Sequence, residues 1–600
     1  MGYYESFYPG KNYGGGLFGN PLGYTERVSG FNLALDPRTA NQLQETSNKL
    51  NTGIKNIEIQ GTFAKVLEAI PDEHLREINK LSKITGTKLS FHGPLVEPSG
   101  FNQQAGRWEE FNRLGVERQL SSAVERAHQL DPKGNIVVTL HSSSELPEML
   151  QREKVDGKEK QTGMYIVDPR TGKVNMIKET ERYFPESASE KKEAFDPAKE
   201  LNRINNEQWT DTLRQFAYYA DIAENRGGRE RLPEPVKVIQ HEIDAGKLKF
   251  EDAVKDSPAL AQYLISPGSE GDETRNIYLR NSYNDLKTLF DIAYKNALEH
   301  NNKIDLEKLN HFKKEVHELY PRLENNDSGA LSVVIQDGLH ILKKMDSKPQ
   351  IFQPFNDFVI DKSSTTFANV ALNSYKKFGK DDSAPIISIE NPPAGSGLSR
   401  AEDLKKLIDQ SRKKFEDGLV KEGYSREAAE KASEKTIGAT WDVGHINMIR
   451  KFGFDKKDLI KEAETISPYL KHVHLSDNFG FEHTELPMGM GNVPLKEEFA
   501  KFGEKIKNVQ KVIEVGDWWQ HFKTAPLVET FAAFSSPIYS DNGPSWNQAA
   551  MRYGNYFGGF GTMLPEQHFS MYGGGFSTLP TELGGQIQRK GSGLSGTPME

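Results

Sequence analysis

Histidine and acidic residues recur in this chain where short apolar runs end. In one such run, residues 470–477 read Leu-Lys-His-Val-His-Leu-Ser-Asp, and the alternation of apolar with imidazole side chains predicts a strand. A glycine-rich turn that carries His483 follows at once. The chain has no cysteine, so any metal ion must be held by His, Asp, Glu or backbone oxygen. The run therefore predicts a strand end that supplies metal ligands, although a lone strand histidine is more often an ordinary core or surface residue.

The same arrangement recurs at the ends of six predicted strands. Their terminal residues are His92, His141, Glu390, Asp442 with His445, His474 with Asp477, and Glu514. Each of them alone has an ordinary structural explanation, such as packing in a core or capping a helix. Six in succession favour a shared metal site, because imidazole and carboxylate groups are the usual protein ligands of divalent cations.

The elements that must position these residues are eight strands, each followed by a helical stretch or a long connection. The strands are predicted at 28–35, 54–61, 88–94, 135–143, 384–391, 436–445, 470–477 and 510–516. Right-handed strand–helix–strand units of this number close into a (β/α)8 TIM barrel, an α/β fold. Because the carboxyl ends of parallel strands meet at one face of such a barrel, the six terminal positions are expected to lie together.

The pattern also divides the chain into five parts. Residues 28–150 and 351–530 are predicted to form the first and second parts of the barrel, and 151–350 a large, mainly helical insertion after strand four. Residues 1–27 and 531–600 are rich in glycine and aromatic residues and lack a helix or strand period, so they are predicted to be terminal arms.

Composition and charge exclude some classes of function. No apolar run approaches the roughly 18 residues that a membrane helix needs, and the start lacks a secretory pattern, so a cytoplasmic protein without membrane contact is expected. The formal charge of −9 argues against a protein that grips long nucleic acid. The oligomeric state is left open.

Seven short motifs resemble those of a known superfamily, the xylose-isomerase-like barrels, over about residues 28–150 and 384–520. They are Phe-His-Gly-Pro at 91–94, Leu-His-Ser at 140–142, Ile-Glu-Asn at 389–391, Asp-Val-Gly-His at 442–445, His-Leu-Ser-Asp at 474–477, His483 ahead of Met-Gly-Met-Gly-Asn-Val, and Ile-Glu-Val at 513–515. The superfamily includes sugar isomerases and epimerases and also apurinic endonucleases of the endonuclease IV type. The motifs do not choose between these members.

Resemblance to the isomerases and epimerases implies a single divalent ion, Zn, Mn or Mg. Its implied ligands are Glu390, Asp442, His474 and Glu514. Such an ion polarises a carbonyl and the adjacent hydroxyl while two carboxylates move a proton on and off carbon, here Glu390 and Glu514. His445 and His92 are then expected to bind the substrate.

Resemblance to the endonucleases implies up to three zinc ions instead. His92, His141, His445 and His483 join the four ligands in that case. The chain departs from this pattern at Phe481, where the endonucleases have an aspartate two positions before the histidine matched by His483, and at Ser142, which follows His141. The third ion is therefore the least supported.

Three functional hypotheses remain open. The first is a metal-dependent isomerase or epimerase of a sugar or sugar phosphate, with a small carbohydrate as partner, favoured by the acidic charge and by the departure at Phe481. The second is a zinc-dependent phosphodiesterase that cuts abasic DNA, favoured by the number of ligands. The third is a barrel that serves as a binding scaffold.

Overall fold

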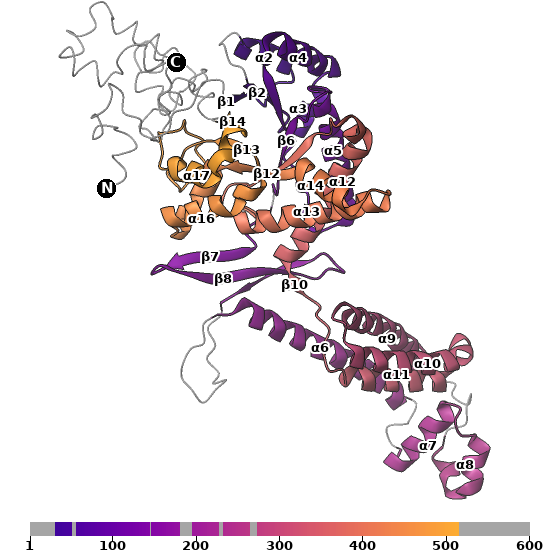
Figure 1. Ribbon diagram of the computed structural model, residues 1–600. Coiled ribbons are helices and arrows are strands. Elements are labelled where there is room, and N and C mark those ends of the chain that lie inside the picture. Colours follow the sequence, from indigo (N-terminus) through magenta and orange to yellow (C-terminus); the bar gives the residue numbers. More distant parts are fainter. Residues whose placement is uncertain are drawn as a thin grey trace, which may run out of the picture. The chain divides into compact units, whose positions relative to one another are not determined.

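The computed structural model describes residues 31–50, 56–144, 146–179, 195–226, 232–264 and 273–514. The two predicted arms, 1–27 and 531–600, lie outside this part of the chain. The chain divides into two compact units, one made of residues up to 188 together with those from 354 onward, and the other of residues 189–353. Figure 1 labels the elements of both units.

The first unit contains a closed barrel of eight parallel strands, which confirms the predicted fold class (Figure 1). In the order in which they pair around the barrel, the strands are β1 (Phe31–Ala34), β14 (Gln510–Ile513), β13 (Leu470–Leu475), β12 (Ile437–Asp442), β11 (Ile386–Glu390), β6 (Val137–His141), β3 (Lys88–His92) and β2 (Asn56–Gln60). Adjacent strands in sequence are adjacent in the barrel, apart from the two long excursions of the chain around β4–β5 and between β6 and β11.

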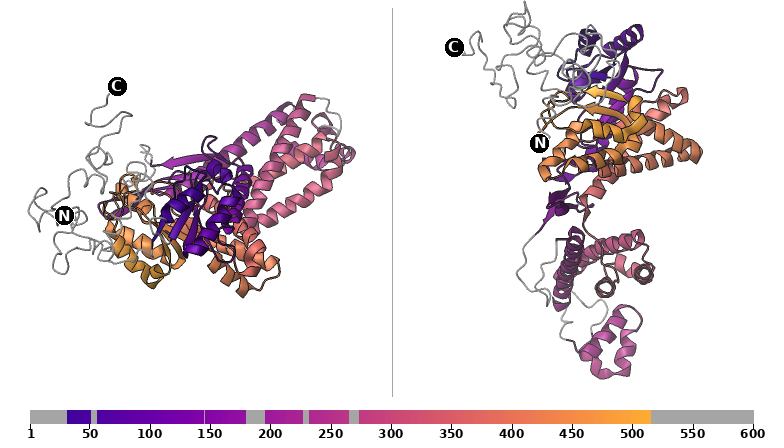
Figure 2. Two further views of the ribbon diagram at one scale, coloured as in Figure 1. Left: turned by 90° about the horizontal axis from the view of Figure 1, so that it is seen from above. Right: turned by 60° about the vertical axis from the view of Figure 1, so that its left-hand side comes forward.

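Helices surround the strands (Figure 1, Figure 2). Those that contact one another in succession are α2 (Gln42–Leu50), α4 (Asp72–Thr85), α5 (Glu110–His128), α12 (Phe355–Phe378), α13 (Ala401–Lys421), α16 (Lys456–Ile466) and α17 (Leu495–Phe502). Shorter helical segments are α3 (Ala64–Ala69), α14 (Arg426–Thr436), α15 (Val443–Asn447), η4 (Gly379–Asp381), η5 (Met448–Phe452), η6 (Ser467–Tyr469) and η7 (Gly503–Lys507). Helix α12 contacts both α5 and α13, so it takes the crossover position between β6 and β11.

Alternate side chains along each barrel strand point either to the surrounding helices or into the barrel interior. On β2, Ile57 and Ile59 join the apolar core under the helices, whereas the side chain of Glu58 contacts residues of β3 and β13 inside the barrel. Barrel interiors of this class are usually filled by branched apolar residues. Here the buried inner layer is polar, and its members are Glu58, Ser90, Thr139, Ser388, Thr440 and His472.

A small antiparallel sheet follows β6. It consists of β7 (Leu150–Val155), β8 (Lys158–Val167), β9 (Val174–Lys178) and β10 (Gln353–Pro354), and a separate pair is formed by β4 (Phe101–Asn102) and β5 (Arg107–Trp108). The mainly helical insertion predicted for 151–350 therefore begins with strands. Asp156 and Gly157 link β7 to β8, and both have the positive φ that a two-residue hairpin turn requires.

The second unit is helical and has a core of its own. Its elements are α6 (Pro197–Arg226), α7 (Glu234–Asp244), α8 (Phe250–Asp256), η3 (Pro258–Gln262), α9 (Glu273–Glu299), α10 (Lys303–Glu324) and α11 (Ser328–Lys343). The predicted apolar face of α6, which includes Trp209 and Phe216, is buried against residues of α9 and α11. In the part of the chain that the structure describes, no helix is both long and apolar enough to cross a bilayer.

A buried ion pair fixes the start of α13, directly after the loop that leaves β11. Arg400 donates to Glu462 on α16 at 2.9 and 2.7 Å, and the backbone N–H of Ala401 donates to the same carboxylate at 2.7 Å. Replacing Glu462 with Ala leaves the guanidinium buried without its partner, so we expect a loss of about 3 kcal/mol or more in the free energy of unfolding. Chemical denaturation measures the loss.

The matched control is Glu497→Ala, because Glu497 pairs with Lys456 in solvent. An exposed pair contributes at most about 1 kcal/mol. Equal losses in the two variants would contradict a special role for the buried pair.

Candidate metal centre

The carboxylate of Glu390 lies at the middle of the candidate site. It is fully buried at the end of β11. Its Oε1 lies 2.8 Å from Nδ1 of His474 on β13, and its Oε2 lies 3.2 Å from Nε2 of both His92 and His141. Residues from three other strands thus meet at one carboxylate, as the parallel barrel requires of their C-terminal ends.

The imidazole of His474 faces two carboxylates with one nitrogen. Nδ1 lies 2.8 Å from Oε1 of Glu390 and 2.7 Å from Oε2 of Glu514, which follows β14. Burial alone would lower the pKa of His474, but the charges of Glu390, Glu514 and Glu58 raise it well above its usual value. A ring nitrogen carries one proton, whereas a cation at this point would interact with all three ligands at once.

Asp442 and His445 form a second part of the site at the end of β12. Asp442 caps α15 by accepting a hydrogen bond from the backbone N–H of His445 at 2.7 Å. The Nδ1–H of His445 in turn donates to the backbone oxygen of Asn391 at 2.8 Å, which leaves its Nε2 with a free lone pair 4.0 Å from Oδ2 of Asp442. Burial and the charges of Glu390 and Glu514 raise the pKa of Asp442 to about 7, and burial lowers that of His445 to about 4.

The turn after β13 supplies fewer side chains to the candidate metal centre than the strand ends do. The ring of His483 lies 4.6 Å from that of His445, and its Nε2 lies 3.5 Å from Oε1 of Glu485. Phe481 is 67% exposed and supplies no ligand. Asp477 is occupied in bracing the turn, because it accepts hydrogen bonds from the backbone N–H groups of Asn478, Gly489 and Val493.

Three groups of side chains in the described residues have ligand atoms close enough to hold a metal ion. They are His92, Glu390, His474 and Glu514; Glu390, Asp442 and His445; and Glu58, His472 and His474. His141 contacts the first group through Glu390. The structure thus groups Glu390, His474 and Glu514 with His92, and groups Asp442 with Glu390 and His445, rather than placing all four implied ligands in one group. The predicted residues Asp477 and His483 belong to none of the three groups.

Two residues of these groups were missed in the sequence. Glu58 lies two positions before the end of β2, and His472 lies two positions before His474. For Glu58, the sequence signal is the alternation Ile57-Glu58-Ile59, which places its carboxylate on the face opposite to the apolar side chains. Neither residue is at the terminal position of its predicted strand, and β2 ends in glutamine.

The donor set fits a divalent cation. Oε2 of Glu390 is buried, yet it makes no hydrogen bond of normal geometry within the described residues. Buried polar atoms without partners are costly and mark places where a ligand is missing. Imidazole nitrogen with carboxylate oxygen suits zinc, and sites richer in oxygen suit manganese or magnesium.

Comparison with known proteins adds little to this geometry. No protein-family model and no curated protein matches the chain. A search of solved structures finds a chain described as a D-tagatose 3-epimerase-like protein, with 12% sequence identity and a TM-score of 0.33 over 81% of this chain and 91% of the other. Similarity this low indicates no function for the chain.

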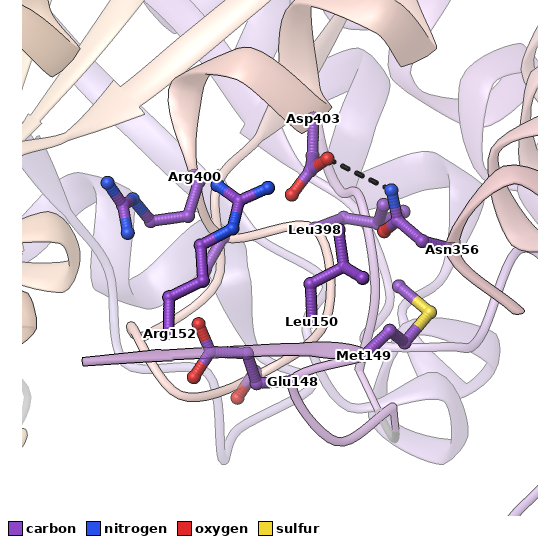
Figure 3. Close-up of a pocket in the computed structure, with 10 residues that line it drawn as sticks. Glu148, Met149, Leu150, Arg152, Asn356, Leu398, Arg400 and Asp403 are labelled. Carbon is purple, nitrogen blue, oxygen red and sulfur yellow. Dashed lines mark hydrogen bonds between the residues drawn. The ribbon is translucent and has the colours of Figure 1, made fainter. Parts of the chain in front are cut away.

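A small polar cavity lies near the same barrel mouth, between the loops that follow β6 and β11 (Figure 3). It encloses about 10 Å³, which is enough for about one water molecule. Asp403 accepts a hydrogen bond of 3.0 Å from Asn356 on one side, and Glu148 lies near Arg152 on the other. Burial raises the pKa of Glu148 to about 7, in spite of the charges of Arg400 and Arg152.

We predict that Glu148 makes stability depend on pH. A carboxyl whose pKa is higher in the folded than in the unfolded chain contributes stability below pH 4.5 and loses it as pH rises towards 7. Glu148→Gln removes this dependence, so its melting temperature relative to the wild type should rise between pH 5 and pH 8. A constant difference between the two proteins over this range would contradict the assignment.

We also predict that Asp442→Ala and His474→Ala lower the metal content of the purified protein. Each change removes one ligand from a buried group. Elemental analysis after dialysis against Zn²⁺ measures the effect, and His311→Ala, at an exposed histidine on α10, is the control. Full metal content in both site variants would show that the centre is misplaced.

Proposed function

We propose that this protein is a divalent-metal-dependent isomerase or epimerase that acts on a small sugar or sugar phosphate. The observation that carries the proposal is the convergence of Glu390 and Glu514 on a single nitrogen of His474. Two carboxylates beside one metal position provide the acid and the base that proton transfer at carbon needs. Glu390, Asp442, His474 and Glu514 would hold the ion, which would supply polarisation of the substrate carbonyl.

The two carboxylates differ in access and therefore in role. Glu390 is fully buried, whereas the side chain of Glu514 is 21% exposed and is within reach of a substrate in the mouth. Burial alone would raise the pKa of Glu514, but the charge of His474 lowers it to about 2. Glu514 is thus ionised at neutral pH, which a group that takes a carbon-bound proton requires.

Two imidazoles are placed to bind substrate oxygens. His445 is neutral at pH 7 because burial lowers its pKa to about 4, and its Nε2 presents a lone pair that can accept a hydrogen bond from a hydroxyl. His92 lies beside Glu390 on the opposite side from His474 Nδ1 and can contact a second oxygen. These contacts would orient the substrate for proton transfer.

One observation favours a second candidate, a zinc-dependent phosphodiesterase. The two oxygens of Glu390 face different histidines, with His474 at Oε1 and both His92 and His141 at Oε2. A carboxylate with ligands on both oxygens is suited to bridge two ions, which is the arrangement of two-metal phosphoryl transfer. Against it stands the formal charge of −9, because tight binding of a DNA backbone needs clustered Lys and Arg.

We predict that Glu514→Gln abolishes turnover while retaining most of the metal. The amide keeps an oxygen of similar position but cannot take a proton, so incorporation of solvent deuterium into the sugar should fall by about 100-fold or more. The measurement is mass spectrometry on a panel of ketoses and their phosphates in D₂O, with metal content determined on the same samples.

The same panel includes one abasic DNA duplex, which separates the two candidates. Cleavage of the duplex by the wild type, without deuterium exchange into any sugar, would overturn the isomerase proposal in favour of the phosphodiesterase. Exchange that persists in Glu514→Gln would show that another group is the base.

A further inference from the structure

Beneath the candidate metal centre, the barrel holds a second polar layer built around Glu58. Its Oε2 accepts a hydrogen bond of 3.0 Å from the hydroxyl of Ser90, and its Oε1 accepts one of 3.2 Å from the amide of Gln60. These two donors, on β3 and β2, hold the carboxylate in place. The side chain of Glu58 is fully buried, so no solvent competes for it.

The carboxylate of Glu58 faces His474 from the side opposite to the metal position. Oε1 of Glu58 lies 3.4 Å from Nε2 of His474, whereas Glu390 and Glu514 contact Nδ1 of the same ring. The ring is therefore held between carboxylates at both nitrogens. A proton on Nε2 is attracted to Glu58, and the lone pair of Nδ1 is then free for a cation.

We propose that Glu58 is a positioning residue that fixes the tautomer and orientation of His474, and thereby sets the metal affinity of the centre. The inference deepens the proposed metal site and rests on it. Carboxylates that hold the second nitrogen of a metal-bound histidine typically change metal affinity 10- to 100-fold when they are replaced.

The neighbouring His472 also faces Glu58 but belongs to the inner layer of the barrel. Nε2 of His472 lies 3.7 Å from Oε2 of Glu58, and its Nδ1 lies 3.3 Å from the hydroxyl of Thr139. His472 is fully buried in the inner layer. Within the described residues, it shares no candidate metal group with Glu390 or Glu514. At 3.7 Å its contact with Glu58 is not a hydrogen bond, and Nε2 of His472 has no hydrogen-bond partner within the described residues.

The experiment measures Co²⁺ binding, which needs no substrate and gives a visible spectrum that reports the ligand field. We expect Glu58→Gln, which keeps the shape of the side chain but not its charge, to bind Co²⁺ at least about tenfold more weakly and with a shifted spectrum. Glu58→Met, which removes the acceptor, should lose more affinity than Glu58→Gln. Full-length wild-type protein, freed of metal by a chelator, is the reference.

The control is Ser388→Ala, which removes a buried hydroxyl from the same layer. Ser388 accepts a hydrogen bond of 2.7 Å from Thr440, and no contact joins it to His474 in the described structure. We expect this variant to lower the melting temperature while leaving Co²⁺ affinity within about twofold and the spectrum unchanged. A merely structural role for Glu58 would give the same result for Glu58→Gln, and that outcome would overturn the inference.

Three other outcomes are informative. Loss of one whole equivalent of Co²⁺ in Glu58→Gln, with the remainder bound as in the wild type, would make Glu58 a ligand of a separate ion and would also overturn the inference. If the wild type binds no Co²⁺, the metal centre itself fails, and the positioning role with it. Wild-type binding without activity on any sugar removes the proposed reaction but leaves the role of Glu58 standing.

Discussion

Several like charges are held inside one barrel mouth, and the rest of the site depends on how they are neutralised. Glu58, Glu390, Asp442 and Glu514 all lie in or at the interior, and the first three are essentially excluded from solvent. Uncompensated buried carboxylates are strongly unfavourable, because each loses its hydration and repels the others. The histidines around them are thus required by charge as much as by chemistry, and a divalent cation would relieve the same repulsion more completely than protons do.

Acidic side chains serve two different purposes at this mouth. Glu390 and Glu514 face the candidate metal centre. Glu97 and Asp477 instead accept hydrogen bonds from groups in the surrounding loops. Glu97 accepts hydrogen bonds from the hydroxyls of Ser99 and Ser143 and from the backbone N–H of Ser144, which ties the loop after β3 to the loop after β6. These loops follow the strands that end at His92 and His141, so Glu97 joins the chain close to both histidines. Rigid loops of this kind are what precise ligand geometry requires.

The barrel and its strand-end residues could be predicted because both rest on local pattern. Alternating or continuous apolar runs reveal the strands, and the parallel topology then dictates that His92, Glu390 and His474 meet. Asp477 also ends a predicted strand, but its carboxylate is consumed by backbone donors up to 16 positions away, which no local pattern reveals. Glu58 was missed because it lies inside the barrel below the mouth. Strand β7 was missed because its sequence is mostly charged or polar and lacks an apolar face, although Asp156-Gly157 is a recognisable hairpin turn. Strands β8 and β9 were missed even though they bury Met164, Ile166 and Ile177.

The pairing of β6 with β11 places Glu390 opposite His141, 249 positions apart in the chain (390 − 141). Closing a loop of that length, compared with about 30 residues for a usual strand–helix–strand unit, costs only about 2 kcal/mol more, because the entropy grows with the logarithm of length. The long separation in sequence has a larger effect on the time needed to complete the barrel than on its stability. At roughly 5 to 20 residues per second, synthesis of the second half follows the first by tens of seconds. During that interval β1 and β6 are open edges of a half-made sheet, so the nascent chain is exposed to misassembly long before the metal centre can form.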